Sequence, residues 1–290
     1  MLRTTRFCLY LATFLLFILT SQSAQAQMER KRVSRDRPVD NTFMAPKVIG
    51  FNTVNNLDKQ TLHSMIMHSF GPVNNGAQEF FGLDSYANIR LSLDYGLTDR
   101  LSVGLARQRL DKVVDLHYKY NLLRQKQDGS VPVSVAWAGN AGVTTEDYNL
   151  GFDFVNRLSY FQQLMIARKF SDRFSAQISP VYAHFNTVFD QELNDHFGIS
   201  LAGRLRLTDR SHFTFEYTPI FTQTGPDQEN PISLGFDIIT GGHVFQLFFT
   251  TSQGLNEAYA LGRNTDDFWA GDIRFGFNVN RVFFLGDTGR

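Results

Sequence analysis

The stretch 87–109, ANIRLSLDYGLTDRLSVGLARQR, decides the fold of this chain. Apolar residues occupy every second position of its first half, and polar residues stand between them. A period of two indicates a β-strand with one apolar and one polar face. The word LTDR at 97–100 combines a small polar residue with an aspartate, which favours a tight turn. The stretch therefore predicts a β-hairpin.

The turn word recurs as FSDR at 170–173 and as LTDR at 207–210, each time between alternating runs. No long window has helical periodicity. The segment PKVIGFNTV at 46–54 fits either a short strand or a segment tucked under a barrel. Beyond it, twelve strand-like runs are predicted, near 57–70, 84–97, 101–109, 112–123, 130–139, 155–170, 174–187, 196–207, 211–221, 232–239, 243–251 and 270–284.

The connections between these runs alternate in length. Those after even-numbered runs are short, whereas those after odd-numbered runs are long, except for a brief LD after the third. Short periplasmic turns opposite long outer loops are typical of outer-membrane barrels. A secreted β-sandwich also alternates, but strands of ten or more residues and the loop asymmetry favour a barrel. We therefore predict an all-β fold, a single antiparallel up-and-down transmembrane β-barrel of about 12 strands with both termini at the periplasmic rim.

The start of the chain predicts export. Arg3 and Arg6 precede a short apolar run, and an Ala24-x-Ala26 pattern follows it, as in a signal peptide cleaved after Ala26. A retained anchor is the rival, but a membrane-spanning helix needs about 20 apolar residues. Three parts are expected: a signal peptide at 1–26, a flexible periplasmic tail at 27–45 and an outer-membrane barrel at 46–286. The only cysteine, Cys8, lies in the signal peptide, which argues against disulfides and cysteine chemistry in the mature chain.

Charge and composition narrow the class of protein further. Removing Arg3 and Arg6 from the 28 basic residues leaves 26 against 28 acidic ones, which gives no reason to expect nucleic-acid binding. The chain has 28 Phe and 10 Tyr but a slightly negative mean hydropathy. That combination is typical of a barrel in the outer membrane of a Gram-negative bacterium. The expected partners are outer-membrane lipid, the barrel-assembly machinery, and small solutes or ions.

The region from His68 to Leu123 carries a resemblance to a known family. Its distinctive stretches are HSFG at 68–71, FFGLD at 80–84, and YG at 95–96 running through the turn into VGL at 103–105. It resembles a family of outer-membrane β-barrel proteins of unknown function, of the porin-like superfamily, common in Bacteroidetes. The similarity covers roughly 57–285 and implies a barrel with no established activity and no catalytic residues. The chain departs from the usual terminal aromatic residue, because LGDTGR follows Phe284.

Histidines and serines offer no catalytic or metal-binding pattern. His63 and His68 are five positions apart and so face opposite sides of a strand, while the other histidines are scattered over different strands. They are interpreted as polar residues of the lumen or the rims. A lipid hydrolase needs a serine within reach of a histidine, yet Ser64 and His68 stand about 13 Å apart on one face. We expect no catalytic residues, no cofactor and no metal.

Charged residues on the polar faces are the candidate functional residues. An arginine facing lipid at mid-depth costs about 2–4 kcal/mol, so these side chains should point into the lumen. Arg204 and Glu216 should be direct or diagonal neighbours across the 208–210 turn, close enough to pair. Either such pairs seal the lumen, or the charges set the selectivity of a narrow pore. The candidate lumen charges are Arg90, Asp94, Asp115, Lys119, Arg204, Arg206, Glu216, Asp237, Asp272 and Arg274.

Three functions remain open from the sequence. The first is a passive channel or transport component with a mixed-charge polar lumen. The second is a structural or docking barrel that binds a partner through its outer loops or its N-terminal tail. The third is a membrane-embedded lipid hydrolase. The strand number does not predict whether the lumen is open or plugged. Barrels of about eight strands are filled by their side chains, barrels of about sixteen hold water, and twelve lies between.

Overall fold

The computed structural model describes residues 37–148, 151–188, 193–222 and 228–285, which belong to one compact unit. The signal peptide expected at 1–26 lies outside the described residues. The strands in chain order are β1 (Thr61–Pro72), β2 (Asn88–Gly96), β3 (Leu101–Gln108), β4 (Val113–Leu123), β5 (Ser134–Thr144), β6 (Leu158–Lys169), β7 (Phe174–Phe185), β8 (Asp195–Arg206), β9 (Ser211–Tyr217), β10 (Ile232–Thr240), β11 (His243–Thr250) and β12 (Arg274–Phe284).

These strands form one closed barrel. Each strand pairs antiparallel with its neighbours in sequence, and β1 pairs with β12 to close the sheet, for example through Met65 opposite Asn280. The prediction of an all-β, up-and-down antiparallel barrel of twelve strands is therefore confirmed. Among the described residues, no helix has both the length and the apolar character needed to cross a membrane.

The recurrent turn motif, LTDR at 97–100 and 207–210 and FSDR at 170–173, has the same structure in all three places. The hydroxyl oxygen of Thr98 accepts hydrogen bonds from the backbone N–H groups of Arg100 and Leu101, at 3.1 and 2.9 Å. Ser171 and Thr208 each accept the corresponding pair of bonds in their own turns. A Ser or Thr hydroxyl that satisfies local backbone donors stabilises a tight turn. The hydroxyl at the second position therefore stabilises these three turns.

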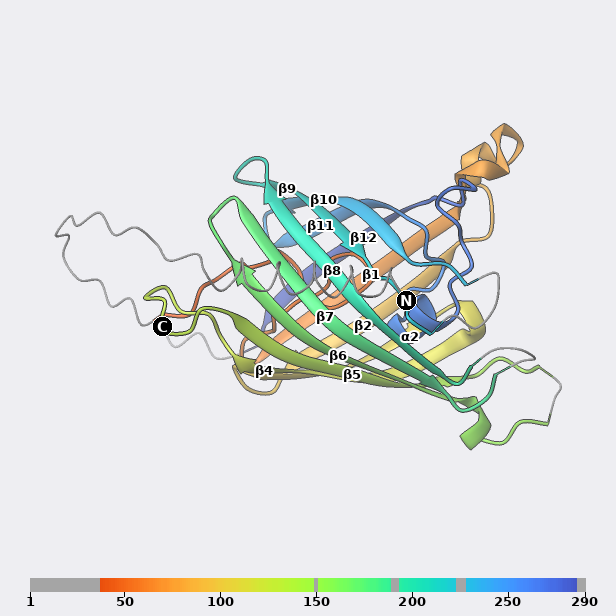
Figure 1. Cartoon of the computed structure of the whole chain (residues 1–290), viewed down its shortest axis with the longest axis horizontal. Coiled ribbons are helices and arrows are strands. Elements are labelled where there is room, and N and C mark those ends of the chain that lie inside the picture. Colours follow the sequence, from red (N-terminus) through yellow and green to blue (C-terminus); the bar gives the residue numbers. More distant parts are fainter. Residues whose placement is uncertain (1–36, 149–150, 189–192, 223–227, 286–290) are drawn as a thin grey trace, which may run out of the picture. The chain divides into compact units, whose positions relative to one another are not determined.

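The two rims differ as the loop lengths predict (Figure 1). The short turns lie together at one end of the barrel, which we call the short-turn rim, and the long connections lie at the other, the long-loop rim. The connection at 109–112 is the short member of the long-loop rim. The helical elements lie in the long connections or, in one case, in this short one: η1 (Val73–Asn75), η2 (Ala77–Gly82), η3 (Leu110–Lys112), η4 (Val155–Arg157) and α2 (Glu257–Gly262).

The two faces of the sheet have opposite characters. Leu91, Leu105 and Leu116 on the outer face are each more than half exposed. Arg90, next to Leu91, and Asp115, next to Leu116, are polar, buried and point inward. An apolar outer face and a polar inner face are what a barrel needs when its outer surface meets lipid. The alternation read from the sequence is thus the alternation of the barrel wall.

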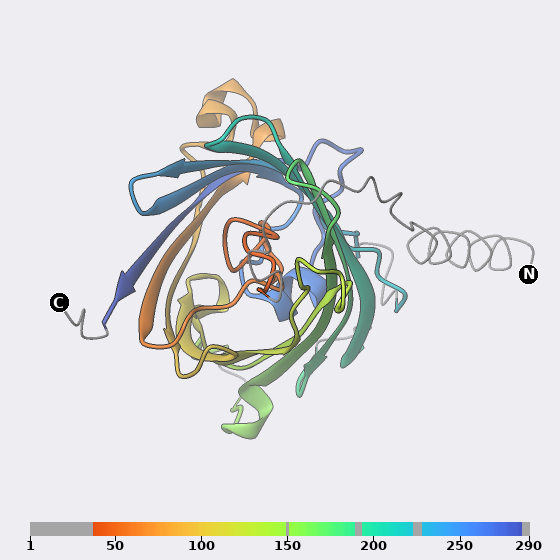
Figure 2. The same cartoon turned by 90° about the vertical axis from the view of Figure 1, so that its left-hand side faces the viewer.

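The interior of the barrel holds two further pieces of the chain (Figure 2). One is residues 42–57, which we call the luminal segment, and the other is α2 with its flanking loop. The segment enters at the short-turn rim, where Val39 and Gln127 pair with the backbone of Gln125 and Arg37. The luminal segment is then joined to the wall only through β1, whereas α2 is joined to it at both ends.

The luminal segment corrects two expectations. Residues 27–45 were expected to be a flexible tail, yet Phe43 is 1% exposed and Ala45 is 2% exposed inside the barrel. Their apolar side chains gain burial there, which an exposed tail does not offer. The barrel was expected to begin at residue 46, but its wall begins at Thr61. Of the two alternatives left open for 46–54, the structure shows the tucked segment.

Several strand boundaries also differ from the sequence prediction by about four residues, as at Asn88 of β2 and Tyr217 of β9, and two further cases lie beside turns. The run expected at 130–139 is found at Ser134–Thr144, because residues 126–131 continue the preceding turn. The run expected at 270–284 begins only at Arg274. Gly271 adopts a φ of 84° in a turn that precedes this strand, a conformation that glycine adopts without strain.

Candidate functional site: the closed lumen

Small residues on the inner face of β5, β6 and β8 make room for the luminal segment. Ala136, Ala138, Ala167 and Ala202 are all buried there, in one apolar cluster with residues of the segment. Alanine leaves space where a larger side chain would fill the lumen. The segment fills this space with its own apolar side chains, namely Phe43, Val48, Ile49 and Val54.

A second apolar cluster surrounds Phe51. Its ring lies 6.0 Å, centroid to centroid, from that of Phe161 on β6. Tyr259 and Leu261 of α2 belong to the same cluster, as does Phe185 of β7. The segment and α2 therefore share one buried core inside the barrel.

Side chains of the wall bind the main chain of the segment. The carboxamide of Gln163 accepts a hydrogen bond from the N–H of Asn52 at 3.2 Å and donates one to its carbonyl oxygen at 3.1 Å. Gln177 likewise accepts from the N–H of Val54 at 3.0 Å and donates to the carbonyl of Asn52 at 2.8 Å. Buried backbone groups need such partners. The two glutamines act on the segment as a neighbouring β-strand would.

Four more wall side chains continue this pattern. Glu216 accepts hydrogen bonds from the N–H groups of Gly50 and Phe51, both at 3.1 Å. Gln246 and Asn278 donate to the carbonyl oxygens of Val48 and Ile49, at 2.7 and 3.2 Å. The Lys119 ammonium donates to the carbonyls of Pro46 and Asn55, at 2.7 and 3.0 Å. Most polar contacts between the wall and the luminal segment therefore involve the main chain of the segment and not the segment's side chains.

Glu257 of α2 binds two side chains of the segment, one of which, Asn52, also donates to the Gln163 side chain at 3.3 Å. The Lys47 ammonium forms a buried ion pair with its carboxylate, and the Asn52 amide donates to the same oxygen at 3.0 Å. Asn140 of β5 donates to the other oxygen at 3.0 Å. Burial acts to raise the pKa of Glu257, but Lys47 and Arg90 outweigh it and hold the pKa below its ordinary value. The Glu257 carboxylate thus stays charged beside Lys47.

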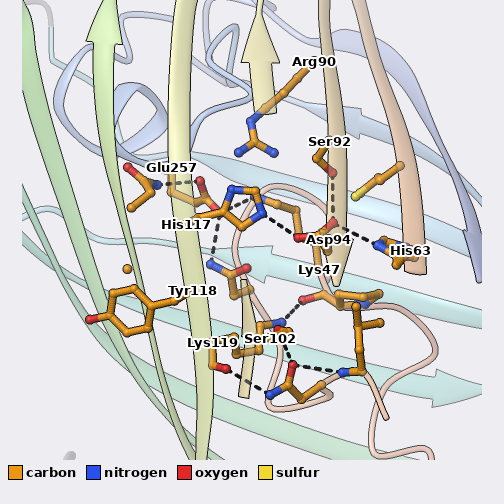
Figure 3. A pocket seen from close by; sticks show the side chains of 17 residues that line it. Lys47, His63, Arg90, Ser92, Asp94, Ser102, His117, Tyr118, Lys119 and Glu257 are labelled. Atoms are coloured by element: carbon orange, nitrogen blue, oxygen red, sulfur yellow. Dashed lines mark hydrogen bonds and ion pairs between the residues drawn. The ribbon is translucent and has the colours of Figure 1, made fainter. Parts of the chain in front are cut away.

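A separate charge network covers the inner face of β1, β2 and β4 (Figure 3). Arg90 donates to both oxygens of Asp115, at 2.9 and 3.0 Å. His117 contacts Asp115 through Nδ1 at 3.0 Å and Asp94 through Nε2 at 2.5 Å. Asp94 also contacts Nδ1 of His63 at 3.1 Å. This chain of alternating charged groups lies beside the Lys47–Glu257 pair and contacts the flank of α2 through Asn256, which donates to Asp115.

Separate cavities remain between the contents of the lumen and its wall. One has an empty volume of about 520 Å³, and Lys47, Arg90, Asp94, His117 and Glu257 are among its lining residues (Figure 3). Two others, of about 330 and 300 Å³, lie beside Tyr259 and beneath the loop at Gly50. These spaces are narrow remnants of the lumen around the segment and α2.

The structure places seven of the ten candidate charges on the inner wall. Arg90, Asp94, Asp115 and Lys119 lie on β2 and β4 and make the contacts given above. On the opposite side, Arg204 contacts the Met44 sulfur at 3.1 Å and the Ser175 hydroxyl at 3.4 Å. Asp237 accepts a hydrogen bond from Gln246 at 3.0 Å, and Glu216 binds the segment.

The other three candidates lie at the rims. Arg206 pairs with Asp209 in the adjoining turn of the short-turn rim. Arg274, the first residue of β12, pairs with Asp266 at the long-loop rim. Asp272 precedes β12 and lies in the loop, where it accepts a hydrogen bond from Asn74 at 2.6 Å. The expectation that Asp272 points inward from a strand is wrong, because the strand begins at Arg274, four residues later than predicted.

The expected pair between Arg204 and Glu216 is not formed. In the register of β8 with β9, Ala202 stands opposite Glu216 and Thr214 opposite Arg204, so the two charges are diagonal neighbours. The Glu216 carboxylate instead binds Gly50 and Phe51, because the luminal segment places two backbone donors directly beside it. The lumen is closed by a chain segment, and this candidate wall pair plays no part in it.

Sequence reasoning missed Lys47 and Glu257 as functional residues. Lys47 was assigned to the undecided segment 46–54, and Glu257 to a long loop. Strand parity does contain a signal for His117, which shares a face with Asp115 and Lys119 in VVDLHYKYNLL. Nothing in the local sequence shows that Lys47 and Glu257 meet, since 210 positions separate them.

The serine and histidine that the hydrolase hypothesis considered lie on the outer face of the barrel. Ser64 and His68 are partly buried residues of β1 on the face opposite Met65. His68 stacks on Phe277 of β12 with centroids 5.1 Å apart. This histidine therefore packs between aromatic rings on the lipid-facing side.

Fold and interior together define a class of protein: a transmembrane β-barrel whose lumen is closed by its own chain. The particular family follows from the match of residues 43–283 to the model described as membrane bound beta barrel domain (DUF5777). That match spans most of the chain, and the protein belongs to this family. The matched region begins at Phe43, so the luminal segment is part of the family domain.

Solved structures with a similar fold include membrane channels. The NanC porin aligns with a TM-score of 0.49 at 9% identity, over 77% of this chain and 98% of that one. The KdgM porin gives 0.48 at 8% identity, over 77% and 99%. An outer membrane channel from Pseudomonas putida F1 gives 0.47 at 12% identity, over 79% and 97%. At these values the likeness reaches no individual residue or site. No curated protein sequence matches the chain.

Proposed function

We propose that the protein is an outer-membrane channel whose lumen is closed, in the state described here, by the luminal segment. The observation that carries the proposal is that a separate segment of the chain, and not only side chains of the wall, fills the barrel. A barrel with a purely structural role can fill its interior with wall side chains, as barrels of about eight strands do. Here the wall keeps small residues inside, and a segment from outside the wall occupies the space.

The way the segment is attached supports its role as the movable part. It reaches the wall covalently only at β1, and the exposed residues Asp58, Lys59 and Gln60 form the connection. Apart from the Lys47–Glu257 ion pair, most of its polar contacts are hydrogen bonds with wall side chains, which water can replace once the segment leaves. The twelve-stranded wall needs no rearrangement for this. Withdrawal of residues 42–57 toward the short-turn rim would leave a polar lumen.

The wall left behind suits the passage of a polar solute. Its inner face carries charges of both signs together with a set of amide side chains, including Gln163, Gln177, Gln246 and Asn278. Inside a narrow tube these groups act through a lower dielectric than at an open surface, so each has a large effect on what passes.

The experiment is conductance in planar bilayers. Phe43→Ser with Phe51→Ser weakens the segment without touching the wall, since burying each phenylalanine contributes about 1.5–3 kcal/mol. The double variant should open at least ten times as often as wild type. Lys59→Ser, at an exposed position of the connection, is the matched control and should behave as wild type.

The result that contradicts the proposal is equally clear. If the double variant is folded and inserted, and its segment exchanges amide hydrogens freely, yet neither protein carries current, the channel hypothesis fails. The docking barrel then becomes the better reading. One observation favours that second candidate: Trp269 is 89% exposed and Phe81 is 56% exposed at the long-loop rim, and Phe81 has a positive φ of 54°.

The docking candidate has its own test. Trp269→Ser and Phe81→Ser should leave folding and conductance unchanged if these loops serve a partner outside the barrel. Loss of the protein's cellular phenotype with intact conductance would favour docking, and loss of conductance alone would favour the channel.

A further inference from the structure

The lumen has the features of a binding site for a polypeptide that folds back on itself. In the luminal segment the Val48 N–H donates to the Phe51 carbonyl and the Thr53 N–H to the Pro46 carbonyl, both at 2.9 Å. Six wall side chains contact the main chain of the luminal segment at its N–H groups, its carbonyl oxygens or both. They come from six different strands and from both sides of the barrel: Lys119, Gln163, Gln177, Glu216, Gln246 and Asn278. In peptide-binding proteins, main-chain hydrogen bonds give affinity and pockets for side chains give specificity.

Pockets for side chains are present as well. The inner wall holds an apolar cluster of Ala136, Ala138, Met165 and Phe248, which receives Val48, Ile49 and Val54 of the segment. An apolar surface inside a water-filled lumen is unfavourable, so a lumen intended only for small polar solutes has no use for it. It suits a ligand that has apolar side chains along a polar main chain.

Glu257 supplies a site for one particular side chain. It is 4% exposed, and its carboxylate contacts the Lys47 ammonium and the Asn52 amide. A buried carboxylate that loses such a partner is destabilised. Any chain that replaces the luminal segment should therefore present a cation at this point, and Gly50 marks a position where space is limited, since a Cβ there would lie 3.3 Å from Glu216.

We propose that the substrate class of this channel is a polypeptide that binds as a turn with a lysine side chain at Glu257, and that the luminal segment occupies the site as an intramolecular mimic. The inference rests on the proposed function, because it assigns a substrate to the same lumen. A wall built only to satisfy its own tethered segment is the competing explanation, and it predicts no binding from solution.

The probe is a labelled synthetic peptide with the sequence of residues 43–55, FMAPKVIGFNTVN, bound to full-length protein in lipid nanodiscs. The Phe43→Ser, Phe51→Ser chain should bind it saturably, and wild type should bind it at least tenfold more weakly, because its own segment competes. In a second preparation, a protease site replaces the exposed residues 58–60, so that cleavage frees the natural segment to exchange with the peptide.

Two modified peptides test the chemistry. Methylation of the backbone nitrogens at the Asn52 and Val54 positions removes the donors to Gln163 and Gln177 and should weaken binding at least tenfold. Norleucine at the Lys47 position removes the cation and should have an effect of similar size, which the Glu257→Gln protein should largely abolish. Equal binding of parent and modified peptides, or no binding to either preparation, would overturn the inference.

Conductance separates this inference from the channel proposal. If the double variant conducts and the peptide blocks its current, both stand. Current that the peptide neither blocks nor reduces leaves the channel and removes the polypeptide as its substrate. Saturable binding of the peptide to a protein that never conducts removes the channel and leaves a peptide-binding barrel.

Discussion

The walls on the two sides of the lumen hold their charges in different ways. On β2 and β4, Arg90, Asp94, Asp115 and His117 contact one another directly. On β8 to β10, no ion pair within the described residues joins Arg204, His212, Glu216 and Asp237; Glu216 binds the luminal segment, and Asp237 binds a neutral amide. These four side chains of the first wall therefore satisfy one another, although Lys119 of β4 binds the luminal segment. The second wall depends more on what occupies the lumen.

This difference separates the stability of the barrel from the closure of its lumen. A self-satisfied network stabilises the wall whether or not the segment is present. A wall whose buried polar groups lack partners favours binding of any chain that supplies those partners, because a buried polar group without a partner is costly. Substitutions on the two sides should therefore have effects of different size and on different properties.

The largest effect is expected for Asp115→Asn, which leaves Arg90 buried without its carboxylate. Removal of one partner of a buried pair typically costs about 3–5 kcal/mol. Urea unfolding in detergent should show this loss in wild type and, equally, in the chain with a weakened segment. Asp172→Asn is the control, because Asp172 is exposed in a turn and its pair with Lys169 should contribute about 0–1 kcal/mol. A loss seen only with the segment in place would show that the network does not support itself.

Glu216→Gln should come next, and it should act on the segment, not on the barrel. The carboxylate accepts two backbone hydrogen bonds, and bonds to a charged group contribute about 1.5–3 kcal/mol. Amide exchange of residues 49–54 should speed up about ten- to a hundredfold, while the strands exchange as before. Faster exchange throughout β8 and β9 would instead mean that Glu216 stabilises the wall.

A smaller effect is expected from pH through Glu257. Because its pKa is lowered in the folded protein, its contribution is complete above the pKa of the unfolded chain and is lost as pH falls through the folded value. The difference in unfolding temperature between wild type and Glu257→Gln should therefore be largest near neutral pH and shrink below about pH 4. Titrating groups present in both proteins cancel from this difference. A difference that grows in acid would contradict the charged Glu257–Lys47 pair.

The smallest effect is expected for Arg204→Ser. Arg204 makes no ion pair within the described residues, so its removal leaves no carboxylate uncompensated, and the stability should change by no more than about 1 kcal/mol. Ion selectivity in the open state should nevertheless move toward cations. A loss of several kcal/mol would show that Arg204 does pair with Glu216 in the membrane, and the contrast between the two walls would disappear.

The barrel wall was predictable from the sequence because its rules are local. Alternation in stretches such as 87–109 assigns each side chain to a face, and the hydroxyl in each recurrent turn fixes where a hairpin turns. Strand number and closure followed from these patterns and from loop lengths. Some observed strand boundaries differ from the predicted ones. Those at Ser134 and Arg274 lie next to turns whose residues also fit a strand pattern.

The contents of the lumen were not predictable in the same way. PKVIGFNTV has too few residues to show a period, and its main-chain partners come from strands throughout the chain, such as Gln163 and Gln246. Lys47 and Glu257 meet only because both pieces lie inside the barrel. The alternation of side chains correctly placed Glu216 on the inner wall. Its hydrogen-bond partners, however, belong to the luminal segment, and rules for pairs of neighbouring strands cannot predict them.

The measurement that tests closure by the luminal segment most directly is a reversible lock. Asn52→Cys and Gln163→Cys, whose native side chains are 3.3 Å apart, are introduced into the Phe43→Ser, Phe51→Ser chain with Cys8→Ser. A short thiol cross-linker then joins the segment to β6. We expect current before cross-linking, no current after it, and recovery on reduction. Current that persists with the segment locked in place would contradict closure by residues 42–57.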